Sequence, residues 1–441
     1  MQRLFDAAYL SALTLTFPYW LYQSSRTGKY RRDMSDRLFG NAPSVDQTRS
    51  RVWLHAVSLG EVLMTRPLVE RFHRDRPDIQ LLLSSTTDTG LSVAKERLTT
   101  ATPFRAPLDF SWAVENTLDQ ISPSLLVLAE LELWPNLLLA AHERNIPVCV
   151  VNARISERSF RGYKRFRPVL RRAIESVTWW GAQSEEYADR IKRLVGDAPT
   201  EIAVTGSMKY DGATTDRNNP RTSAMRKLFQ IQPADRVFVA GSTMAPEEQI
   251  LIDIWRELKS ADPKLKFVLV PRHPERFDEV AALLAKQNIS HVRRSRLNGS
   301  EQCLPDVILG DTVGELAAVW GLADLGYVGG SLECKRGGQS MIEPAALGVP
   351  VCFGPSTANF RVTVEQLLLR DAARQVATRD DLRKQLLEWV QNPSDAAAVG
   401  QRAQDFILSQ QGAMERTWDA LVKRLPAVHR PLRHVHSGIP A

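Results

Sequence analysis

Residues 52–75 read VWLHAVSLGEVLMTRPLVERFHRD, and this stretch decides the fold. Its opening, VWLHAV, is almost continuously apolar, which is typical of a short strand buried on both faces of a parallel sheet. The part from residue 61 to residue 75 places apolar side chains at helical spacing instead. Only the short turn SLG separates the two parts, so the stretch predicts one strand–helix unit of an α/β fold.

The same strand–helix unit recurs along the chain. Further apolar runs lie at residues 79–86, 124–130, 148–153, 177–183 and 201–206, and then at 237–242, 266–271, 307–311, 324–331 and 349–354. Between the two series, the chain is polar and contains no clear strand, which indicates a linker between domains. We therefore predict two Rossmann-like, doubly wound α/β domains facing a cleft, at residues 41–212 and 236–425, with a linker at 213–235 and a tail at 426–441.

The N-terminal residues 1–40 are predicted to form a membrane anchor with a basic flank. Residues 4–22, LFDAAYLSALTLTFPYWLY, are the most apolar long stretch and end in aromatic side chains, and a basic cluster follows between positions 26 and 37. This order is typical of an uncleaved anchor whose following domain stays cytoplasmic. A bilayer span needs about 20 apolar residues, so a spanning helix and an interfacial helix both fit. The alternative is an ordinary buried helix of the first domain.

Composition excludes several classes of protein. The chain has 441 residues, of which 24% are charged and 44% hydrophobic, a globular composition that excludes a polytopic membrane protein. Its four cysteines are scattered and form no CxxC pair, which favours a reducing compartment without structural zinc. The net charge of +7 suits an anionic lipid, a phosphorylated substrate or nucleic acid. Because aromatic residues are not interleaved with the basic ones, a nucleic-acid-binding module is disfavoured.

Several catalytic signatures are absent from the sequence. There is no GxGxxG, GxxxxGK[ST], GxSxG or HExxH motif, which disfavours dinucleotide redox, P-loop, serine-hydrolase and zinc chemistry. The Asp-x-Asp signature of metal-dependent sugar transferases is also missing.

Acidic residues follow two of the predicted strands in the first half. Glu61 comes just after the strand that ends in HAV, where a carboxylate either complements the helix dipole or acts as a catalytic base. Glu130 and Glu132 follow the strand SLLVLA, and buried carboxylates require partners. A structural pairing with Arg154 or Arg158 and a position in the same cleft as Glu61 are the two alternatives.

Three loops of the second half suit a nucleotide. Pro271 and Arg272 follow the strand KFVLV, and an arginine there can donate bidentate hydrogen bonds to a phosphate. The loop GDTVGEL (310–316) leads into a predicted helix start, where free N–H groups hold anions. The third loop, GGS (329–331), leads to GGQSMIEP (337–344). Glycine-rich loops at successive strand ends of one domain predict a nucleotide site.

Taken together, the motifs resemble one family. HAVSLGE, AELELWPN, VNARISERS, AQSEE, VTGSMKYD, AGST, LVPRHPERF, GDTVGEL, YVGGSL and the run from GG through EPAALGVPV to GP are similar, in order, to the bacterial 3-deoxy-D-manno-octulosonic acid (Kdo) transferases. The resemblance covers the chain up to about residue 370. It implies a glycosyltransferase-B-type fold and an inverting transferase, without cofactor or metal, that moves Kdo from CMP-Kdo to the lipid A precursor lipid IVA. It also implies a place at the cytoplasmic face of the inner membrane, on an anionic surface, and no nucleic-acid partner.

The resemblance also implies roles for individual residues. Glu61 matches the general base, and Glu130 and Lys209 match groups that stabilise the transition state. The positions that match the CMP contacts are Pro271, Arg272, Val313, Gly314, Glu315, Ser340, Met341, Ile342 and Glu343.

The chain departs from the family's pattern at two places. Gly337-Gly338-Gln339-Ser340-Met341 stands where the family has Gly-Gly-His-Asn-Pro, and Met244-Ala245-Pro246 stands where it has His-Glu-Gly. Both departures remove an imidazole that could meet the donor's carboxylate or phosphate. Another two-domain sugar-nucleotide enzyme, a UDP-sugar transferase or epimerase, is therefore the alternative.

Overall fold

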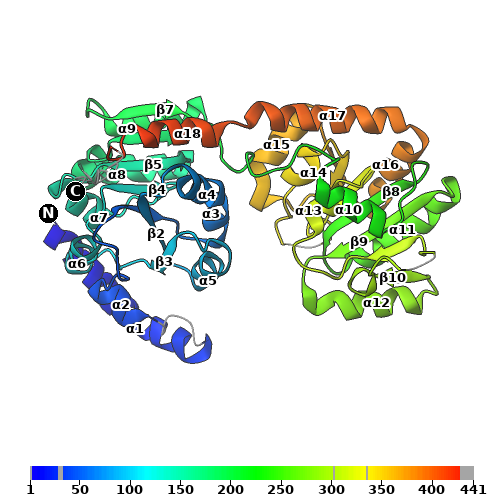
Figure 1. The fold of residues 1–441 in the computed structure, drawn as a ribbon, viewed down its shortest axis with the longest axis horizontal. Helices are drawn as coiled ribbons and strands as arrows, with labels where there is room; N and C mark the ends of the chain where they lie inside the picture. Colours follow the sequence, from blue (N-terminus) through cyan, green and yellow to red (C-terminus); the bar gives the residue numbers. More distant parts are fainter. Residues whose placement is uncertain (1, 28–32, 301–302, 334–335, 428–441) are drawn as a thin grey trace, which may run out of the picture. The chain divides into compact units, whose positions relative to one another are not determined.

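The structure is a computed structural model that describes residues 2–27, 33–300, 303–333 and 336–427. The chain folds into two compact units (Figure 1). Unit 1 contains the chain up to Gly212 and again from Gln411 onward, and unit 2 comprises Ala213–Gln410.

Within the described residues, unit 1 is built on a seven-stranded parallel sheet with the strand order β3-β2-β1-β4-β5-β6-β7. The order reverses between β1 and β4, and doubly wound folds bind ligands at the carboxyl ends of strands beside such a switch point. The strands are β1 (Ser50–His55), β2 (Ile79–Ser85), β3 (Thr102–Arg105), β4 (Leu125–Ala129), β5 (Val148–Ala153), β6 (Trp179–Ala182) and β7 (Glu201–Val204). The helices are α1 (Gln2–Thr27), α2 (Met34–Phe39), α3 (Leu59–Met64), α4 (Arg66–Asp75), α5 (Asp88–Arg97), α6 (Ser111–Ile121), α7 (Pro135–Glu143), α8 (Glu157–Glu175), α9 (Glu185–Val195) and α18 (Ala413–Val422).

The sheet of unit 1 buries side chains on both faces. Trp53 and Leu82 belong to one buried apolar cluster, whereas their neighbours Leu54 and Leu83 belong to another. Successive side chains of a strand point to opposite faces, so the two clusters cover the two sides of the sheet. This two-sided burial is why the strands read as continuous apolar runs in the sequence.

Unit 2 repeats the architecture. Its described residues form a seven-stranded parallel sheet with the order β10-β11-β9-β8-β12-β13-β14. The strands are β8 (Arg236–Thr243), β9 (Leu265–Pro271), β10 (His291–Arg293), β11 (Val307–Leu309), β12 (Leu325–Val328), β13 (Val351–Phe353) and β14 (Arg374–Gln375). The helices are α10 (Pro220–Leu228), α11 (Glu247–Ala261), α12 (Phe277–Lys286), α13 (Leu316–Trp320), α14 (Ile342–Ala346), α15 (Arg361–Leu369), α16 (Arg379–Gln391) and α17 (Pro393–Gln410), with short 3-10 turns η1 (Pro274–Arg276), η2 (Arg294–Arg296) and η3 (Ala358–Phe360). The prediction of two parallel-sheet α/β domains is confirmed.

Helix α1 packs on α6 and α7 through its first turns. Phe5 is buried, and the buried Asp6 carboxylate accepts hydrogen bonds from the backbone N–H (2.8 Å) and hydroxyl (2.6 Å) of Ser111. Tyr9 donates to the Asp109 carboxylate at 2.9 Å. Further along the helix, three leucines are exposed: Leu10, Leu13 and Leu15. In the part of the chain that the structure describes, no helix is long and apolar enough to cross a membrane, so the anchor stays a prediction.

The boundaries of the second unit differ from the predicted ones at both ends. The predicted linker 213–235 is part of unit 2, because Phe229 is fully buried and the Arg217 guanidinium donates to the Gly321 carbonyl at 3.2 Å. Many residues of this segment are polar because they lie at the surface of unit 2, and this polar composition was interpreted from the sequence as a linker.

At the other end, α18 belongs to unit 1, whereas the sequence analysis placed it in the second domain at 236–425. The Trp418 ring packs edge-on against the Phe72 ring of α4, with centroids 4.9 Å apart. The Asp211 carboxylate accepts hydrogen bonds from the backbone N–H groups of Gly412 and Met414, both at 2.6 Å. An amphipathic pattern predicts a helix with one buried face but not the sheet that the face covers.

Candidate active site

Glu61 lies in the first turn of α3, directly after β1. Ser58 caps this helix, since its hydroxyl accepts from the Glu61 N–H (3.4 Å) and donates to the Glu61 carboxylate (2.8 Å). The second carboxylate oxygen accepts from the Val57 N–H at 2.8 Å. Burial raises the pKa of Glu61, these hydrogen bonds oppose the rise, and the charge of Glu130 adds to it. The carboxylate therefore serves as a helix cap and is also shifted toward a proton-accepting range.

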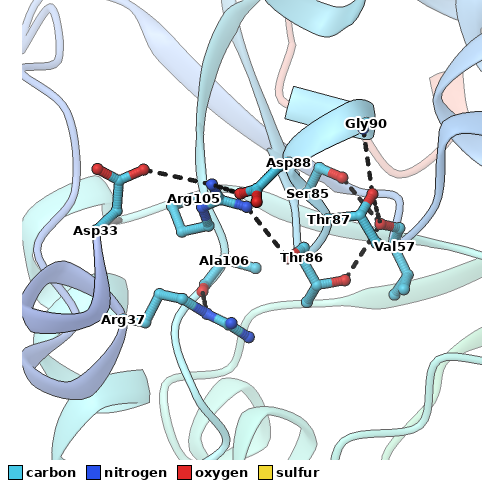
Figure 2. Close-up of polar contacts among 10 residues, drawn as sticks. All are labelled: Asp33, Arg37, Val57, Ser85, Thr86, Thr87, Asp88, Gly90, Arg105 and Ala106. Carbon is cyan, nitrogen blue, oxygen red and sulfur yellow. Dashed lines mark hydrogen bonds and ion pairs between the residues drawn. The ribbon is translucent and has the colours of Figure 1, made fainter. Parts of the chain in front are cut away.

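The loops that follow β1, β2 and β3 hold this turn in place (Figure 2). The Val57 carbonyl accepts hydrogen bonds from the hydroxyls of Ser85 (2.9 Å), Thr86 (3.2 Å) and Thr87 (3.1 Å). Arg105, whose side chain is 8% exposed, bonds the Thr86 carbonyl at 3.2 Å and pairs with Asp88. Because Val57 also donates to Glu61, this hydroxyl cluster fixes the position of the carboxylate.

Glu130 follows β4 and forms an ion pair with Lys209. The Glu130 backbone adopts a left-handed conformation (φ 60°), and its N–H donates to the Val151 carbonyl at 2.9 Å. Its carboxylate lies 3.0 Å from the Lys209 ammonium, which comes from the turn after β7. The Asn152 side-chain oxygen accepts from the Met208 N–H at 3.1 Å and so holds that turn. The structure thus brings together two residues separated by 79 positions in the sequence (209 − 130).

Glu132 has the most perturbed carboxyl group of this cluster. Burial, and then the negative charges of Glu61 and Glu130, raise its pKa to about 7. Within the described residues, neither Glu130 nor Glu132 forms an ion pair with Arg154 or Arg158, so the structural pairing considered from the sequence is wrong. Three mutually interacting carboxyl groups therefore gather at the carboxyl ends of β1 and β4, on either side of the switch point.

A small cavity of about 10 Å³ lies at the same edge of the sheet, roughly enough for one water molecule. Sequence analysis missed its two titratable residues, His55 and Asp109. Burial lowers the pKa of His55 to about 4, and burial raises the pKa of Asp109 to about 6 against opposing hydrogen bonds. The other residues lining the cavity are Trp53, Thr86, Ala106, Pro107, Val114, Trp134 and Leu137. The signal of His55 in the sequence is a polar residue inside an apolar strand, which alone indicates only a satisfied core group, and Asp109 lies in the loop between β3 and α6.

In unit 2, Arg272 is exposed directly after β9. Its backbone N–H donates to the Thr243 carbonyl at 2.9 Å, which fixes the loop. The described residues place no carboxylate within ion-pair distance of the Arg272 guanidinium. Desolvation raises the pKa of Glu343, and the positive charge of Arg272 opposes that rise, so the two predicted residues lie within electrostatic reach. Arg272 is therefore free to bind an anionic ligand.

The loop after β11 presents Val313, which is 70% exposed, and Gly314, which has a φ of 88°. Glu315 pairs with Arg294 at 2.7 Å. The buried Asp311 carboxylate holds the start of this loop by accepting from the backbone N–H (2.7 Å) and hydroxyl (2.6 Å) of Ser295. The predicted helix start follows this loop as α13, which is short, at five residues.

The predicted contacts at 340–343 divide into two kinds. Ser340 is half-buried, and its hydroxyl lies 3.4 Å from the Ile342 N–H. Met341 and Ile342 are buried in unit 2 at 0% and 7% exposure, so a ligand can meet them only through the backbone. The side chains that remain accessible are those of Ser340 and Glu343.

Glu247 and Glu248, at the start of α11, are functional candidates that sequence analysis missed. Both carboxyl groups are buried at 1% exposure. The Glu247 carboxylate accepts hydrogen bonds from the backbone of the glycine loop at 330–332. Because a carboxylate of the protein already occupies these N–H groups, the loop does not offer them to a ligand. The available signal was an acidic pair at the start of an otherwise strongly amphipathic helix.

Comparisons with known proteins extend these observations. A family model described as 3-deoxy-D-manno-octulosonic-acid transferase (kdotransferase) matches residues 26–212. The 3-deoxy-D-manno-octulosonic acid transferase of Haemophilus influenzae is 32% identical over 403 residues, which cover 90% of this chain and 92% of that protein. The protein of the same name from Bordetella pertussis is 34% identical over 381 residues, covering 84% and 86%.

Among solved structures, UDP-GlcNAc 2-epimerase from Neisseria meningitidis matches with a TM-score of 0.56 at 13% identity and covers 85% of this chain and 100% of that one. At this identity the likeness shows the fold alone. Two parallel α/β units of this kind resemble the glycosyltransferase-B-type fold, which enzymes of other activities also share.

The chain belongs to the family of 3-deoxy-D-manno-octulosonic acid (Kdo) transferases, given the extent of its likeness to the Haemophilus and Bordetella proteins. The family predicted from the ordered motifs is confirmed. The alternative of a UDP-sugar transferase or epimerase shares the fold, but similarity over most of the sequence favours the Kdo transferases.

Proposed function

We propose that this protein is an inverting, metal-independent glycosyltransferase that moves Kdo from CMP-Kdo to the lipid A precursor lipid IVA, at the cytoplasmic face of the inner membrane. The observation that carries the proposal is the cluster of Glu61, Glu130 and Glu132 beside Lys209, in a chain of the Kdo transferase family. A sugar acceptor needs a base for its hydroxyl proton, and Glu61 and Glu132 supply carboxyl groups with raised pKa values.

The proposed reaction is a single displacement. Glu61 takes the proton from the acceptor hydroxyl while that oxygen attacks the anomeric carbon of Kdo. The bond between this carbon and the phosphate oxygen breaks, and CMP leaves with the electron pair. The anomeric carbon becomes electron-poor as negative charge develops on the departing phosphate oxygen, and the Lys209 ammonium, held by Glu130, is a cation that can stabilise that negative charge.

Glu132 is the second candidate for the base. Its pKa of about 7 is close to the value at which a general base works best at neutral pH. Glu61 differs in being fixed by two hydrogen bonds from its own loop. The two carboxyl groups interact, so a proton taken up by one raises the tendency of the other to remain ionised.

Unit 2 is proposed to hold CMP-Kdo. The exposed Arg272 guanidinium is suited to the phosphate of CMP, because it can donate charge-assisted hydrogen bonds and has no carboxylate partner in the described structure. Ser340 and Glu343 offer side-chain contacts, and residues 313–315 and 341–342 offer backbone contacts.

Helix α8 supports the proposed membrane location. Arg158, Arg165 and Arg172 recur every seven residues and thus share one face, and all three are exposed without an ion pair in the described part of the chain. Phe166 is exposed beside them at 59%. Basic side chains with exposed aromatics favour an anionic membrane surface. The opposite, core-facing side of the same helix carries Tyr163, whose pKa is raised by burial and by the charge of Glu132, so α8 lies close to the acidic cluster.

The test is a reaction of purified protein with CMP-Kdo and lipid IVA. A product heavier than the acceptor by Kdo residues, with inverted anomeric configuration by NMR and unchanged yield in EDTA, is expected. Transfer from a UDP-sugar but not from CMP-Kdo would refute the proposal and favour the alternative donor.

A further inference from the structure

Two consecutive glutamates, Glu247 and Glu248, begin α11 and are both buried at 1% exposure. Buried carboxylates are unfavourable unless polar partners replace the lost water. The Glu247 carboxylate has such partners on both oxygens, whereas Glu248 pairs through one oxygen and its other oxygen has no hydrogen-bond partner among the described residues. The partners lie at the ends of β8, β9 and β12, in the candidate nucleotide site.

The Glu247 carboxylate is surrounded by five donors. One oxygen accepts from the backbone N–H groups of Met244 (3.0 Å) and Gly330 (2.7 Å). The other accepts from the Tyr327 hydroxyl (2.7 Å) and from the N–H groups of Ser331 and Leu332 (both 2.9 Å). A single side chain thereby joins the loop after β8 to the loop after β12, because Met244 follows β8 and residues 330–332 follow β12.

The loop after β12 is tied further to β13. The Ser331 hydroxyl donates to the Val328 carbonyl at 2.7 Å and accepts from the Gly354 N–H at 2.9 Å. Hydrogen bonds therefore join the glycine loop to β12, to the residue after β13 and to Glu247, and Glu247 accepts those from its successive N–H groups.

Glu248 acts on the neighbouring loop. Its carboxylate pairs with the Arg276 guanidinium at 3.1 Å, and this arginine lies in η1, four residues after Arg272. Arg276 also pairs with the exposed Glu279 at 3.0 Å. Because the Arg276 side chain is 20% exposed and Glu248 is 1% exposed, the pair anchors the far end of the Pro271–Arg276 loop to the start of α11.

We propose that Glu247 and Glu248 are positioning residues of the donor site: Glu247 fixes the glycine loop at 330–332, and Glu248 fixes, through Arg276, the loop that presents Arg272. The inference rests on the proposed function, because it assumes that these loops bind the donor nucleotide. The inference also assigns different roles to the two loops. Since a carboxylate already occupies the N–H groups of 330–332, the glycine loop contributes to the shape of the donor site but donates no backbone hydrogen bonds to the donor from these residues. The phosphate is therefore bound by Arg272.

The first test concerns Glu248 and Arg276. The nucleotide affinity of the full-length protein is measured by calorimetry with CMP, and the KM values for donor and acceptor are measured separately, for E248Q, R276Q and the double variant. E257Q is the matched control, because Glu257 lies on the same helix with 54% of its side chain exposed. We expect each single variant to bind CMP about tenfold more weakly or worse, with an unchanged acceptor KM. The double variant should bind CMP no more weakly than the single variant with the lower CMP affinity, because both changes break the same ion pair.

The second test concerns Glu247 and does not depend on the nucleotide. In E247Q, an NH₂ group replaces one carboxylate oxygen and faces backbone N–H donors, so it cannot accept their hydrogen bonds. Amide exchange in residues 329–333 should then speed up about tenfold or more, beyond any change in the other strand-end loops of unit 2. E247Q should also bind CMP more weakly if it remains folded. If its melting temperature collapses, the affinities of E248Q and R276Q for CMP decide whether the start of α11 positions the donor site.

The outcomes separate the two proposals. Wild-type protein that binds CMP, with E248Q and R276Q binding equally well, overturns the inference and leaves the proposed function standing. Unchanged exchange of residues 329–333 in E247Q overturns the role of Glu247. Wild-type protein that fails to bind CMP overturns the proposed donor and, with it, the link between these loops and the nucleotide. Additive losses in the double variant, or an equal rise in the acceptor KM, would assign the glutamates to general stability of the fold.

Discussion

Replacing Glu61 by glutamine separates the two roles that its position allows. The amide keeps the shape of the side chain but cannot take a proton from the acceptor at neutral pH. If Glu61 is the general base, turnover should fall by about 10²–10⁴-fold, or about 2.7–5.5 kcal/mol of activation free energy.

The effect on stability should be much smaller. The carboxylate accepts one hydrogen bond from the Val57 N–H and one from the Ser58 hydroxyl, each at 2.8 Å. The single oxygen of an amide replaces one acceptor, so one of these bonds is lost, and the loss of a helix-cap interaction costs about 0.5–2 kcal/mol. In a domain of this size that lowers the melting temperature by about 1–8 °C.

The assay measures turnover with CMP-Kdo and lipid acceptor alongside thermal melts. The matched control is S58A, which removes the capping hydroxyl and keeps the carboxylate, so it should lose similar stability and retain at least a tenth of the turnover. Folded E61Q that retains more than a tenth of wild-type turnover would refute the assignment and transfer the base role to Glu132. Equal losses in S58A and E61Q would mean that the loop geometry, not the proton, limits turnover.

Three further predictions address other parts of the molecule. The pKa of Glu132 is raised from 4.5 to about 7, so the folded protein keeps this proton to a higher pH than the unfolded chain does, and the folded state loses stability as pH rises from 4.5 to 7. E132Q should therefore have a higher melting temperature than wild type at pH 8, and this difference should vanish near pH 4.5. An equal difference in melting temperature at both pH values would contradict the raised pKa. R272A should weaken CMP binding by about 10–150-fold, the equivalent of about 1.5–3 kcal/mol for a charge-assisted bond, and unchanged affinity by calorimetry would place the nucleotide elsewhere. Changing Arg158, Arg165 and Arg172 of α8 to glutamate should reduce binding to anionic vesicles and raise the KM for lipid acceptor but not for CMP-Kdo; normal sedimentation with vesicles would exclude α8 as a membrane-facing element.

Much of the fold could be predicted because its strands are buried on both faces. Runs such as that at 124–130 show continuous apolarity, and the connection from each strand to the following helix places the loops at one edge of each sheet. That rule was sufficient to single out Glu61, Glu130 and Arg272 as residues of strand-end loops. It was not sufficient to assign their partners, because the ion pair between Glu130 and Lys209 joins loops that are far apart in the sequence.

What escaped prediction shares one physical property: it depends on contacts between distant segments. Glu247 binds N–H groups more than 80 residues away, and nothing in its own neighbourhood distinguishes it from a helix-start carboxylate that complements the dipole. The prediction that α18 belongs to the second domain was wrong for the same reason. The helical pattern is local, whereas Phe72, against which Trp418 packs, lies near the beginning of the chain.

The return of α18 to unit 1 has a consequence for the order in which the chain folds during synthesis. The sheet of unit 1 leaves the ribosome first, but the helix that covers Phe72 is made only after the whole of unit 2. At about 5–20 residues per second, the roughly 200 residues of unit 2 delay that helix by about 10–40 s. Unit 2, although encoded later, is a continuous segment and can be completed first. During the interval the nascent chain exposes the apolar side chains that α18 later covers, Phe72 among them. A chaperone that shields them is expected to bind ribosome-attached chains that end before residue 411 and to release those that include α18.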